Sequence, residues 1–402
     1  MANRLQVPMG GPLARYAPGF RAELERLGYA ARTVAPLMAL VGQLSAWLES
    51  RGLDEGGLTP EVVESFLRRL HDGGGWFRPT ARTLASLLGY LRELRVTPEP
   101  APSSIGTPLE ELIGRYRGYL LGERGLAEGT VDYYIDAARL FLSGQRPIDR
   151  LDWEHLSLGD VVGFATRECP RRSVGSAKNL LTGLRSLLRF MQLEGLTTAP
   201  LAQAVPSAAG WRGSALPRAL RPGEATRMLA SCERRRATGR RDYAILVLLV
   251  RLGLRAGEVA ALTLKDLDWR AGEIVIRGKG RSLERLPLPA DAGEAVVAYL
   301  RHGRPDSADR AVFLRAHAPL RGLSSGGVAE VVRAAGERAG LPGVGAHRLR
   351  HTAATEMLRA GAPLSEVAQV LRHRSAATTA IYAKVDHVAL ATLALPWPAG
   401  AS

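Results

Sequence analysis

The stretch HRLRHTAATEMLRAG, residues 347–361, is expected to form a helix that ends at Gly361. His347 and Arg350 are three residues apart, so they project from one face of that helix. A guanidinium can bind a phosphate through two parallel hydrogen bonds, and an imidazole beside it can donate a bond or move a proton. The pair indicates a phosphodiester-binding site, although an HxxR pattern is weak evidence when it stands alone.

Three other segments add polar side chains in a fixed order along the chain. GLRAGEVAAL places Arg255 at the end of the nearly all-apolar stretch RDYAILVLLVRLGL, which we expect to be a core helix. EIVIRGKGRSLERLPLP alternates polar and apolar residues around Lys279, which predicts a β-hairpin with this lysine at its tip. LRHRSAATTAIYAKV places His373 nine residues before Tyr382.

This order of residues resembles the catalytic domain of the tyrosine recombinase (phage integrase) family. The resemblance covers about residues 108–395, of which 108–200 are similar to the core-binding domain of the family. The residues that match the catalytic pattern of Arg, Lys, HxxR, His or Trp, and Tyr are Arg255, Lys279, His347, Arg350, His373 and Tyr382.

The resemblance implies a role for each of these side chains. Tyr382 would attack a DNA phosphorus and form a 3′-phosphotyrosine. Arg255, Arg350 and His373 would supply the positive charge that a phenolate and a phosphorane-like transition state need. Lys279 would protonate the leaving 5′ oxygen, and His347 would assist proton transfer at the nucleophile.

The reaction so implied needs no metal and no other cofactor. The sequence agrees, because it has no GxxxxGK[ST] loop and no carboxylate cluster. Its two cysteines, Cys169 and Cys232, lack CxxC spacing, which argues against a zinc site and a disulfide framework.

Residues beside the matched positions have less certain roles. We expect His351 to lie on another face of the helix from His347 and Arg350 and to be a structural histidine. Glu258 is expected to form a salt bridge that orients Arg255. Where family members usually have Leu-Gly-His-Ser-Ser, this chain has Leu-Arg-His-Arg-Ser at 371–375. The missing glycine removes an easy left-handed cap, and the two new arginines could contact phosphates.

The fold class expected is mainly α with a small β-hairpin or sheet. Stretches rich in Pro, Ser and Ala, around 96–108 and 197–217, predict linkers. They separate an extra N-terminal helical domain at 1–97, a core-binding domain at 106–200 and a catalytic domain at 215–402. In the terms of the resemblance, the first two are SAM-like DNA-binding domains.

The first two domains also resemble each other. Aligning GYAARTVAPLMALVGQLSAWL with GLAEGTVDYYIDAARLFLSGQ pairs Thr33 with Thr130, an offset of 130 − 33 = 97. Leu84 pairs with Leu181 at the same offset, since 181 − 84 = 97. We interpret residues 1–200 as two copies of one helical domain. Chance similarity between short helical bundles is the alternative, because helical periodicity is degenerate.

The charge of the chain favours a polyanionic partner. It has 54 Lys plus Arg against 39 Asp plus Glu, a net charge of +15. We therefore expect double-stranded DNA with inverted-repeat recombination sites as the partner. A solvated charged surface is the alternative for each basic residue taken singly. The residues expected to contact DNA in the core-binding domain are Thr130, Tyr134, Arg171, Arg172, Lys178, Arg185 and Arg189.

Neither a secretory signal nor a membrane span is predicted, since the longest apolar run is far shorter than the roughly 20 residues that cross a bilayer. We expect the protein to remain in the bacterial cytoplasm, associated with the nucleoid. The apolar tail VDHVALATLAL after Tyr382 is expected to pack on a neighbouring protomer in a DNA-bound tetramer, or on its own domain. A type IB topoisomerase and an inactive DNA-binding relative are the competing interpretations of the whole chain.

Overall fold

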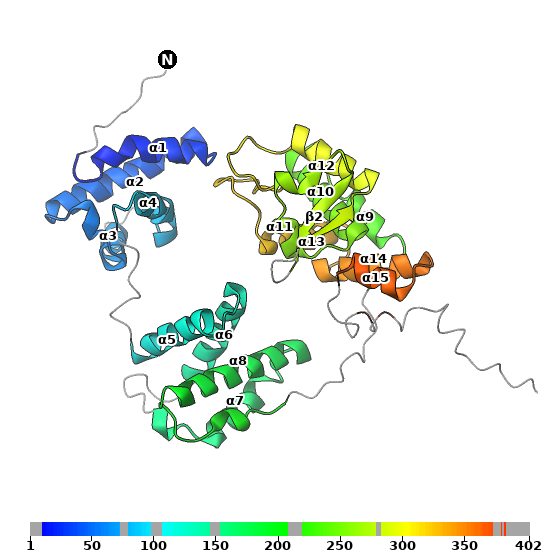
Figure 1. Cartoon of the computed structure of the whole chain (residues 1–402). Coiled ribbons are helices and arrows are strands. Elements are labelled where there is room, and N and C mark those ends of the chain that lie inside the picture. The colour runs from blue at the N-terminus through cyan, green and yellow to red at the C-terminus, as the bar shows by residue number, and fades with distance from the viewer. Residues whose placement is uncertain are drawn as a thin grey trace, which may run out of the picture. The chain divides into compact units, whose positions relative to one another are not determined.

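The computed structural model describes residues 10–72, 79–97, 107–144, 153–207, 219–278 and 283–372, together with Thr379 and Tyr382 (Figure 1). The chain divides into two compact units. One takes the described residues of Met1–Gly57, Val62–Val96 and Gly213–Ser402, and the other takes those of Leu58–Glu61 and Thr97–Arg212. Within the described ranges, no helix is both long and apolar enough to span a bilayer.

The described residues of the N-terminal segment form four α-helices: α1 (Ala17–Arg26), α2 (Ala31–Ser50), α3 (Pro60–Asp72) and α4 (Ala81–Glu93). Short 3₁₀ turns at Ala14–Tyr16 and Glu55–Gly57 flank the first two. The apolar side chains that recur at helical spacing are the buried ones. The core of this bundle includes Phe20, Leu24, Leu44, Leu48, Leu84, Leu87 and Leu91.

The next segment also forms four α-helices: α5 (Pro108–Gly122), α6 (Glu128–Leu142), α7 (Leu158–Glu168) and α8 (Val174–Leu193). The start of α7 is set by a capping box, in which Ser157 and Asp160 satisfy each other's backbone N–H groups. Short 3₁₀ turns lie at Trp153–His155 and Leu201–Gln203. The core of this bundle includes Tyr116, Val131, Phe141, Phe164, Leu181, Leu184 and Leu188.

The two bundles have the same order of helices and a similar placement of buried residues. Helix α2 begins at Ala31 and α6 at Glu128, an offset of 128 − 31 = 97. At that same offset, buried leucines of α4 correspond to buried leucines of α8. These pairs are Leu84 and Leu181, Leu87 and Leu184, and Leu91 and Leu188.

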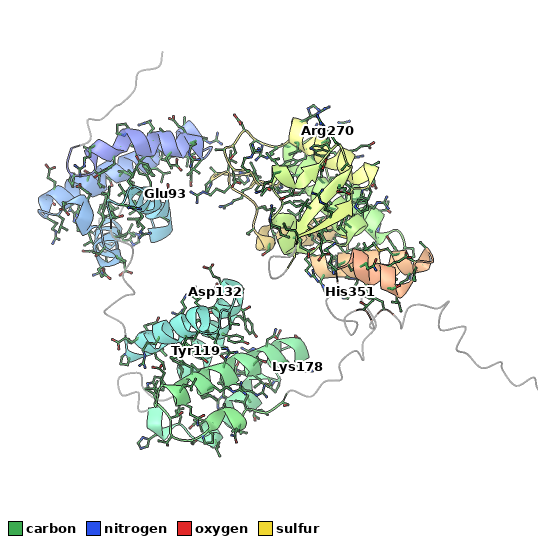
Figure 2. The ribbon with its side chains drawn as sticks, in the orientation of Figure 1. Glu93, Tyr119, Asp132, Lys178, Arg270 and His351 are labelled. Carbon is green, nitrogen blue, oxygen red and sulfur yellow. The ribbon has the colours of Figure 1, made fainter. Side chains whose placement is uncertain are left out.

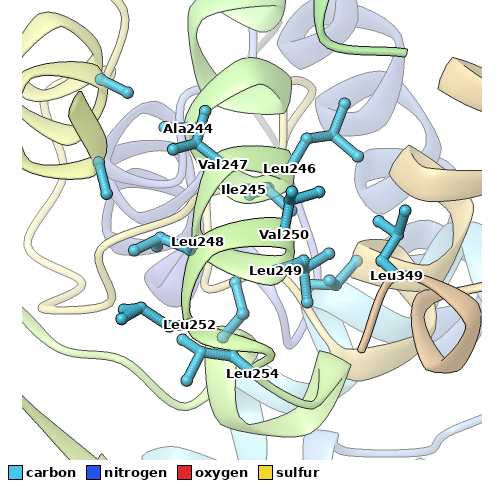
Figure 3. Close-up of a cluster of buried hydrophobic side chains, with 14 of the residues drawn as sticks. Ala244, Ile245, Leu246, Val247, Leu248, Leu249, Val250, Leu252, Leu254 and Leu349 are labelled. Atoms are coloured by element: carbon cyan, nitrogen blue, oxygen red, sulfur yellow. The ribbon is translucent and has the colours of Figure 1, made fainter. Parts of the chain in front are cut away.

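The C-terminal segment is built around α10 (Ala237–Leu252), whose side chains from Ala244 to Leu249 are all buried (Figure 3). Helices α12 (Ala290–His302), α13 (Ser325–Arg338) and α14 (Ala346–Arg359) pack against it. The expectation that this apolar stretch is a core helix is confirmed. The remaining helices are α9 (Glu224–Ala230), α11 (Ala256–Ala260) and α15 (Leu364–Val370), with a 3₁₀ turn at Leu264–Asp266.

A small antiparallel sheet completes this segment, with the strand order β1 (Leu267–Asp268), β2 (Glu273–Arg277), β3 (Leu283–Pro287). The register pairs Ile274 with Leu286 and Arg277 with Leu283. The predicted hairpin is therefore present, and so is the predicted fold class of helices with one small sheet. The tip of the hairpin, including Lys279, lies outside the described residues.

Candidate active site

Arg255 is held at the point where α10 ends and α11 begins. Gly253 caps α10 with a left-handed φ of 56°, and a Cβ there would come within 2.5 Å of the Leu371 side chain, so this turn needs glycine. The next turn places Arg255 as the N-cap of α11. Its side chain stays 46% exposed, which leaves its guanidinium accessible to a ligand.

Glu258 fixes the orientation of Arg255. The Arg255 backbone N–H donates to Glu258 Oε2 at 2.8 Å, and Arg255 Nη1 donates to Oε1 at 2.6 Å. The predicted salt bridge is confirmed. Burial alone would raise the pKa of the Glu258 carboxyl, but the bond from the Arg255 amide and the charge of Arg372 outweigh it and hold that pKa below its usual range. Glu258 is therefore an ionised carboxylate rather than a proton donor.

Arg350, on α14, is almost completely buried, at 2% exposure. Its Nη1 donates to the Gly253 carbonyl at 2.5 Å, and its Nη2 donates to the Leu371 carbonyl. Burial, followed by the charges of Arg255 and Arg372, lowers the pKa of the Arg350 guanidinium to about 10, so it stays charged at neutral pH. From helix α14, this side chain therefore bonds both the end of α10 and the turn after α15.

Tyr382 packs against α14, in a small apolar cluster with Ala354, Leu358, Val367 and Leu371. Its hydroxyl lies 2.7 Å from Nδ1 of His351, the residue that follows Arg350. Burial raises the pKa of the Tyr382 hydroxyl, and the charge of Arg350 acts in the opposite direction. In this arrangement the hydroxyl is protonated at neutral pH.

The two histidines of α14 lie side by side. The rings of His347 and His351 are 4.3 Å apart, and the ring of His351 is 5.5 Å from that of Tyr382. Burial lowers the pKa of His351 to about 4, and the charges of the neighbouring His347 and Arg350 act in the same direction. Burial and the charges of Arg350 and Arg255 also lower the pKa of His347. With its proton on Nε2, a neutral His351 accepts at Nδ1 the hydrogen bond that the Tyr382 hydroxyl donates.

The prediction that His351 lies on another face of the helix from His347 and Arg350 is wrong, because its ring packs against that of His347. The predicted structural role of His351 agrees with its hydrogen bond to Tyr382. Residues four apart on a helix are neighbours, as residues three apart are. His347 and His351 are four apart, so this spacing was a signal in the sequence. Nothing in the sequence indicated the contact between His351 and Tyr382, because the two residues are 31 positions apart.

The prediction that Arg372 contacts phosphates disagrees with its position. Its side chain is 2% exposed and donates from Nη2 to Glu258 Oε2 at 2.7 Å. It takes a left-handed φ of 56° despite being no glycine, so the turn keeps the conformation that the missing glycine would have favoured. In this arrangement the partner of the Arg372 guanidinium is a carboxylate of the chain itself, and no phosphate contact is assigned to it.

Of the six predicted catalytic residues, the structure brings four together. Charges on Arg255 and Arg350 both act on His347, and Arg350 also acts on Tyr382. Lys279 and His373 lie outside the described residues. Within the described part of the chain, no cluster of His, Cys, Asp and Glu is placed to hold a metal ion.

The predicted DNA-contacting residues of the core-binding domain lie in different environments. Thr130 and Arg189 are exposed, whereas Tyr134 and Lys178 are half-buried. Lys178 lies on α8 (Figure 2). Arg185, also on α8, donates to two backbone carbonyls, those of Val205 at 3.1 Å and Pro206 at 2.8 Å.

Two further predicted contacts, Arg171 and Arg172, share one partner within the chain. Both form salt bridges to Glu168, the last residue of α7, and Arg171 does so at 3.0 Å. Arg171 stays largely exposed, while Arg172 is only about a quarter exposed. An ion pair made by a side chain as exposed as that of Arg171 is weak, so this guanidinium is available to exchange partners.

Comparison with known proteins identifies the family of the chain. Residues 218–388 match the model described as the phage integrase family. A protein of Sinorhizobium fredii named as an integrase/recombinase, y4rA, is 38% identical over 409 residues, covering 98% of this chain and 97% of its own length. Tyrosine recombinase XerD of Mycobacterium tuberculosis is 33% identical over 293 residues, covering 68% of this chain and 93% of its own length.

Solved structures share the fold. A lambda integrase dimer bound to a COC′ core site matches with a TM-score of 0.54 and 18% identity, over 75% of this chain and 87% of that one. XerH recombinase bound to a palindromic difH substrate matches with a TM-score of 0.53 and 19% identity. The match covers 73% of this chain and 97% of that one.

The site and these similarities define the class of the protein as an enzyme that cuts and rejoins DNA. The chain belongs to the tyrosine recombinase (phage integrase) family. It is a site-specific recombinase.

Proposed function

We propose that Tyr382 is the nucleophile of this recombinase and that Arg255 and Arg350 bind the phosphate it attacks. One observation carries the proposal: the tyrosine packs on the helix that carries His347 and Arg350, although it is remote from them in the sequence. In the reaction, the bond from Tyr382 Oη to phosphorus forms as the bond from phosphorus to the 5′ oxygen breaks. The phosphate linkage is retained, so an incoming 5′ hydroxyl can reverse the step.

The two arginines supply the charge that this step requires. The phosphate that accepts the tyrosine oxygen becomes more negative at its non-bridging oxygens, and fixed guanidinium groups stabilise that charge. Arg350 donates to two backbone carbonyls and Arg255 donates to Glu258, so both guanidinium groups are oriented by bonds within the chain. Preorganised donors of this kind lower the barrier without reorganising during the reaction.

The arrangement described is a resting state of the nucleophile. A proton transfer from Tyr382 to His351 is strongly uphill, because the pKa of the hydroxyl is raised and that of the imidazole is about 4. The hydroxyl must therefore leave His351 and approach the bound phosphate before it ionises. In this proposal His347 accepts the proton of the hydroxyl, and Lys279 protonates the leaving 5′ oxygen.

The partner in this proposal is double-stranded DNA with inverted repeats, bound by a tetramer of the protein, which would place it with the bacterial nucleoid. The net charge of +15 and the exposed arginines of the second bundle support DNA binding. The solved structures with this fold include a lambda integrase tetramer bound to a Holliday junction. The tail that would connect protomers, VDHVALATLAL, lies outside the described residues.

The N-terminal bundle is proposed to be a duplicate of the core-binding domain that lengthens the DNA footprint. The equal offset of 97 between buried leucines in α4 and α8 supports a duplication. DNase footprints of the full chain and of a chain without residues 1–97 test the role in binding. A shorter protected length on each half-site is expected, and an unchanged length would contradict the proposal.

A nicked duplex tests the nucleophile. It is made from DNA flanking the gene and contains the inverted repeats found there. The nick shortens the fragment that carries the free 5′ hydroxyl after cleavage. This short fragment diffuses away, so the covalent adduct accumulates. The wild-type chain is expected to give an adduct that survives denaturation, and Tyr382→Phe to give none. Tyr133→Phe is the matched control, because Tyr133 also donates its hydroxyl, to Ser176 O at 3.2 Å, but lies in the second bundle.

The same DNA separates a recombinase from a type IB topoisomerase. A plasmid with two copies of the site should yield recombinant circles with the wild-type chain. Relaxed plasmid without recombinants would indicate a topoisomerase instead. Adduct formed equally by Tyr382→Phe would show that another residue is the nucleophile.

A further inference from the structure

We propose that Arg372 is a positioning residue of the active site, which acts through Glu258 to set the orientation and the available charge of Arg255. This inference rests on the proposed function of Arg255 as a phosphate-binding group. It goes beyond that function, because it assigns a role to an arginine at a position where members of the family usually have glycine. The observations that carry it are the backbone, the burial and the hydrogen bonds of this one residue.

The backbone of Arg372 is the first observation. Its φ of 56° lies in the left-handed region, which an L side chain adopts only at a cost. In the described part of the chain, Arg95 is the other non-glycine residue with positive φ. Residues in such conformations persist where the surroundings hold them, and they are concentrated at functional sites. A glycine would remove the strain, so the arginine side chain must contribute something that glycine lacks.

The side chain of Arg372 is the second observation. It is only 2% exposed, and it reaches from the turn after α15 to α11, where Nη2 meets Glu258 Oε2 at 2.7 Å. Nη1 donates to the Val370 carbonyl at 2.8 Å, but Nε is buried without a hydrogen-bond partner. A buried guanidinium with one unsatisfied N–H is a poor device for stability alone. The contact with Glu258 is its main interaction.

Glu258 divides its two oxygens between two arginines. Oε1 receives Arg255 Nη1, while Oε2 receives both the Arg255 backbone N–H and Arg372 Nη2. With Arg255 alone, the carboxylate would cancel the charge of that guanidinium. Arg372 adds a second positive charge to the same carboxylate, so the group of three carries a net charge of +1. That charge is presented on Arg255, because its side chain is 46% exposed and that of Arg372 is buried.

Arg372 also connects parts of the site that are distant in sequence. The residue before it, Leu371, gives its carbonyl to Arg350 Nη2, and the residue after it is the predicted catalytic His373. The bridge through Glu258 therefore holds the turn that leads to His373 at a fixed distance from the N-cap of α11. Losing Arg372 would free this turn from Arg255 without removing any group that touches the phosphate.

Single-turnover cleavage of the nicked duplex at saturating protein tests the role. Arg372→Gly should fold with an unfolding temperature no lower than that of the wild-type chain, because glycine relieves the left-handed backbone. It should nevertheless form adduct at least tenfold more slowly. Arg372→Lys keeps the charge and should recover part of the rate. Arg95→Gly is the matched control: it relieves the other left-handed arginine, which is exposed and lies after α4, and should leave the rate unchanged.

The route through Glu258 is tested by a double-mutant cycle. In a Glu258→Gln background, Arg372→Gly should cost less than threefold, because the carboxylate on which Arg372 acts is absent. Wild-type cleavage by Arg372→Gly would overturn the proposal. So would an equal, multiplicative loss in both backgrounds, since Arg372 would then act independently of Glu258.

A measurement that needs no cleavage keeps this inference separate from the proposed function. The pKa of the Glu258 carboxyl, followed by ¹³C NMR in the full chain, should be higher in Arg372→Gly than in the wild type and should return toward it in Arg372→Lys. An unchanged pKa would overturn the proposed coupling even if the protein cleaves DNA. Absence of any adduct with the wild-type chain, together with the expected pKa change, would instead count against Tyr382 as nucleophile and leave the coupling established.

Discussion

The hydroxyl of Tyr382 and Nδ1 of His351 lie 2.7 Å apart, although one residue belongs to the helix of the HxxR pair and the other follows it by 31 positions. Tyr382 is 2% exposed. The proposed nucleophile therefore packs against its own domain, within hydrogen-bond distance of a neutral imidazole. Cleavage requires that this bond be exchanged for a contact with the phosphate.

Removing the Tyr382 hydroxyl should destabilise the protein as well as inactivate it. Tyr382→Phe leaves His351 Nδ1 without its bond in a buried place, and such a loss costs about 1–2 kcal/mol. Urea unfolding followed by circular dichroism measures it. In Tyr133→Phe the lost bond is exposed, so the free energy of unfolding should change by less than about 0.5 kcal/mol. Equal effects of the two variants would argue that Tyr382 is not docked on His351 in solution.

The free energy of unfolding should decrease as the pH is lowered from about 6.5 to 4. The folded protein keeps His351 neutral until its pKa of about 4, whereas the unfolded chain takes up the proton near the ordinary value of 6.5. Because the unfolded state binds more protons in this window, lowering the pH favours unfolding. The pKa of His347 is shifted in the same direction and adds to the effect.

The contribution of His351 should be on the order of 2 kcal/mol, allowing for partial solvent screening. Urea unfolding at pH 7, 6, 5 and 4 measures it. In His351→Phe the free energy of unfolding should decrease less as the pH is lowered. His302 is exposed, so His302→Phe should show the same decrease as the wild-type chain. A slope that is the same in all three chains would show that His351 titrates at its ordinary value in the folded protein.

The two arginines proposed to bind the phosphate, Arg255 and Arg350, should differ in what their loss does to folding. Arg350→Ala leaves the carbonyls of Gly253 and Leu371 without their donor in the core, which should cost about 3 kcal/mol. Arg255→Ala should cost only about 1 kcal/mol, because the buried Glu258 keeps its bond from Arg372. Both should lose adduct formation by at least a hundredfold.

Thermal unfolding and the nicked-duplex assay distinguish these effects. If Arg255→Ala proved as unstable as Arg350→Ala, the description of Arg255 as an accessible, ligand-binding group would be incorrect. If it were stable and still cleaved DNA at the wild-type rate, Arg255 would not bind the scissile phosphate.

DNA affinity should depend more on Arg189 than on Arg185, although both lie on α8. Arg189 is exposed, whereas Arg185 is engaged with the carbonyls of Val205 and Pro206. Arg189→Ala should weaken binding and reduce the slope of log K against log salt by about 0.9, the value for one phosphate contact. Fluorescence anisotropy at several salt concentrations measures both. Arg185→Ala should leave the slope unchanged and lower the unfolding temperature instead, and the reverse pattern would contradict this assignment.

The sequence by itself determined the local elements and the identity of the chemistry. The apolar run from Ala244 to Val250 can be satisfied only by burial, which predicted the core helix. Alternation around residues 278–280 predicted the hairpin, since strands repeat every two residues. The order of Arg255, Lys279, His347, Arg350, His373 and Tyr382 indicated the family, because these side chain types match its catalytic pattern.

Tertiary structure alone decided which of these side chains meet and in what state. Nothing local to His351 indicates that a tyrosine 31 residues away will donate to it, and nothing local to Arg372 indicates that Glu258, 114 residues earlier, will receive it. The pKa of each group followed from the same packing, because burial and neighbouring charges are properties of the assembled domain. Helix and strand patterns depend on neighbours in sequence, whereas pairing and ionisation depend on neighbours in space.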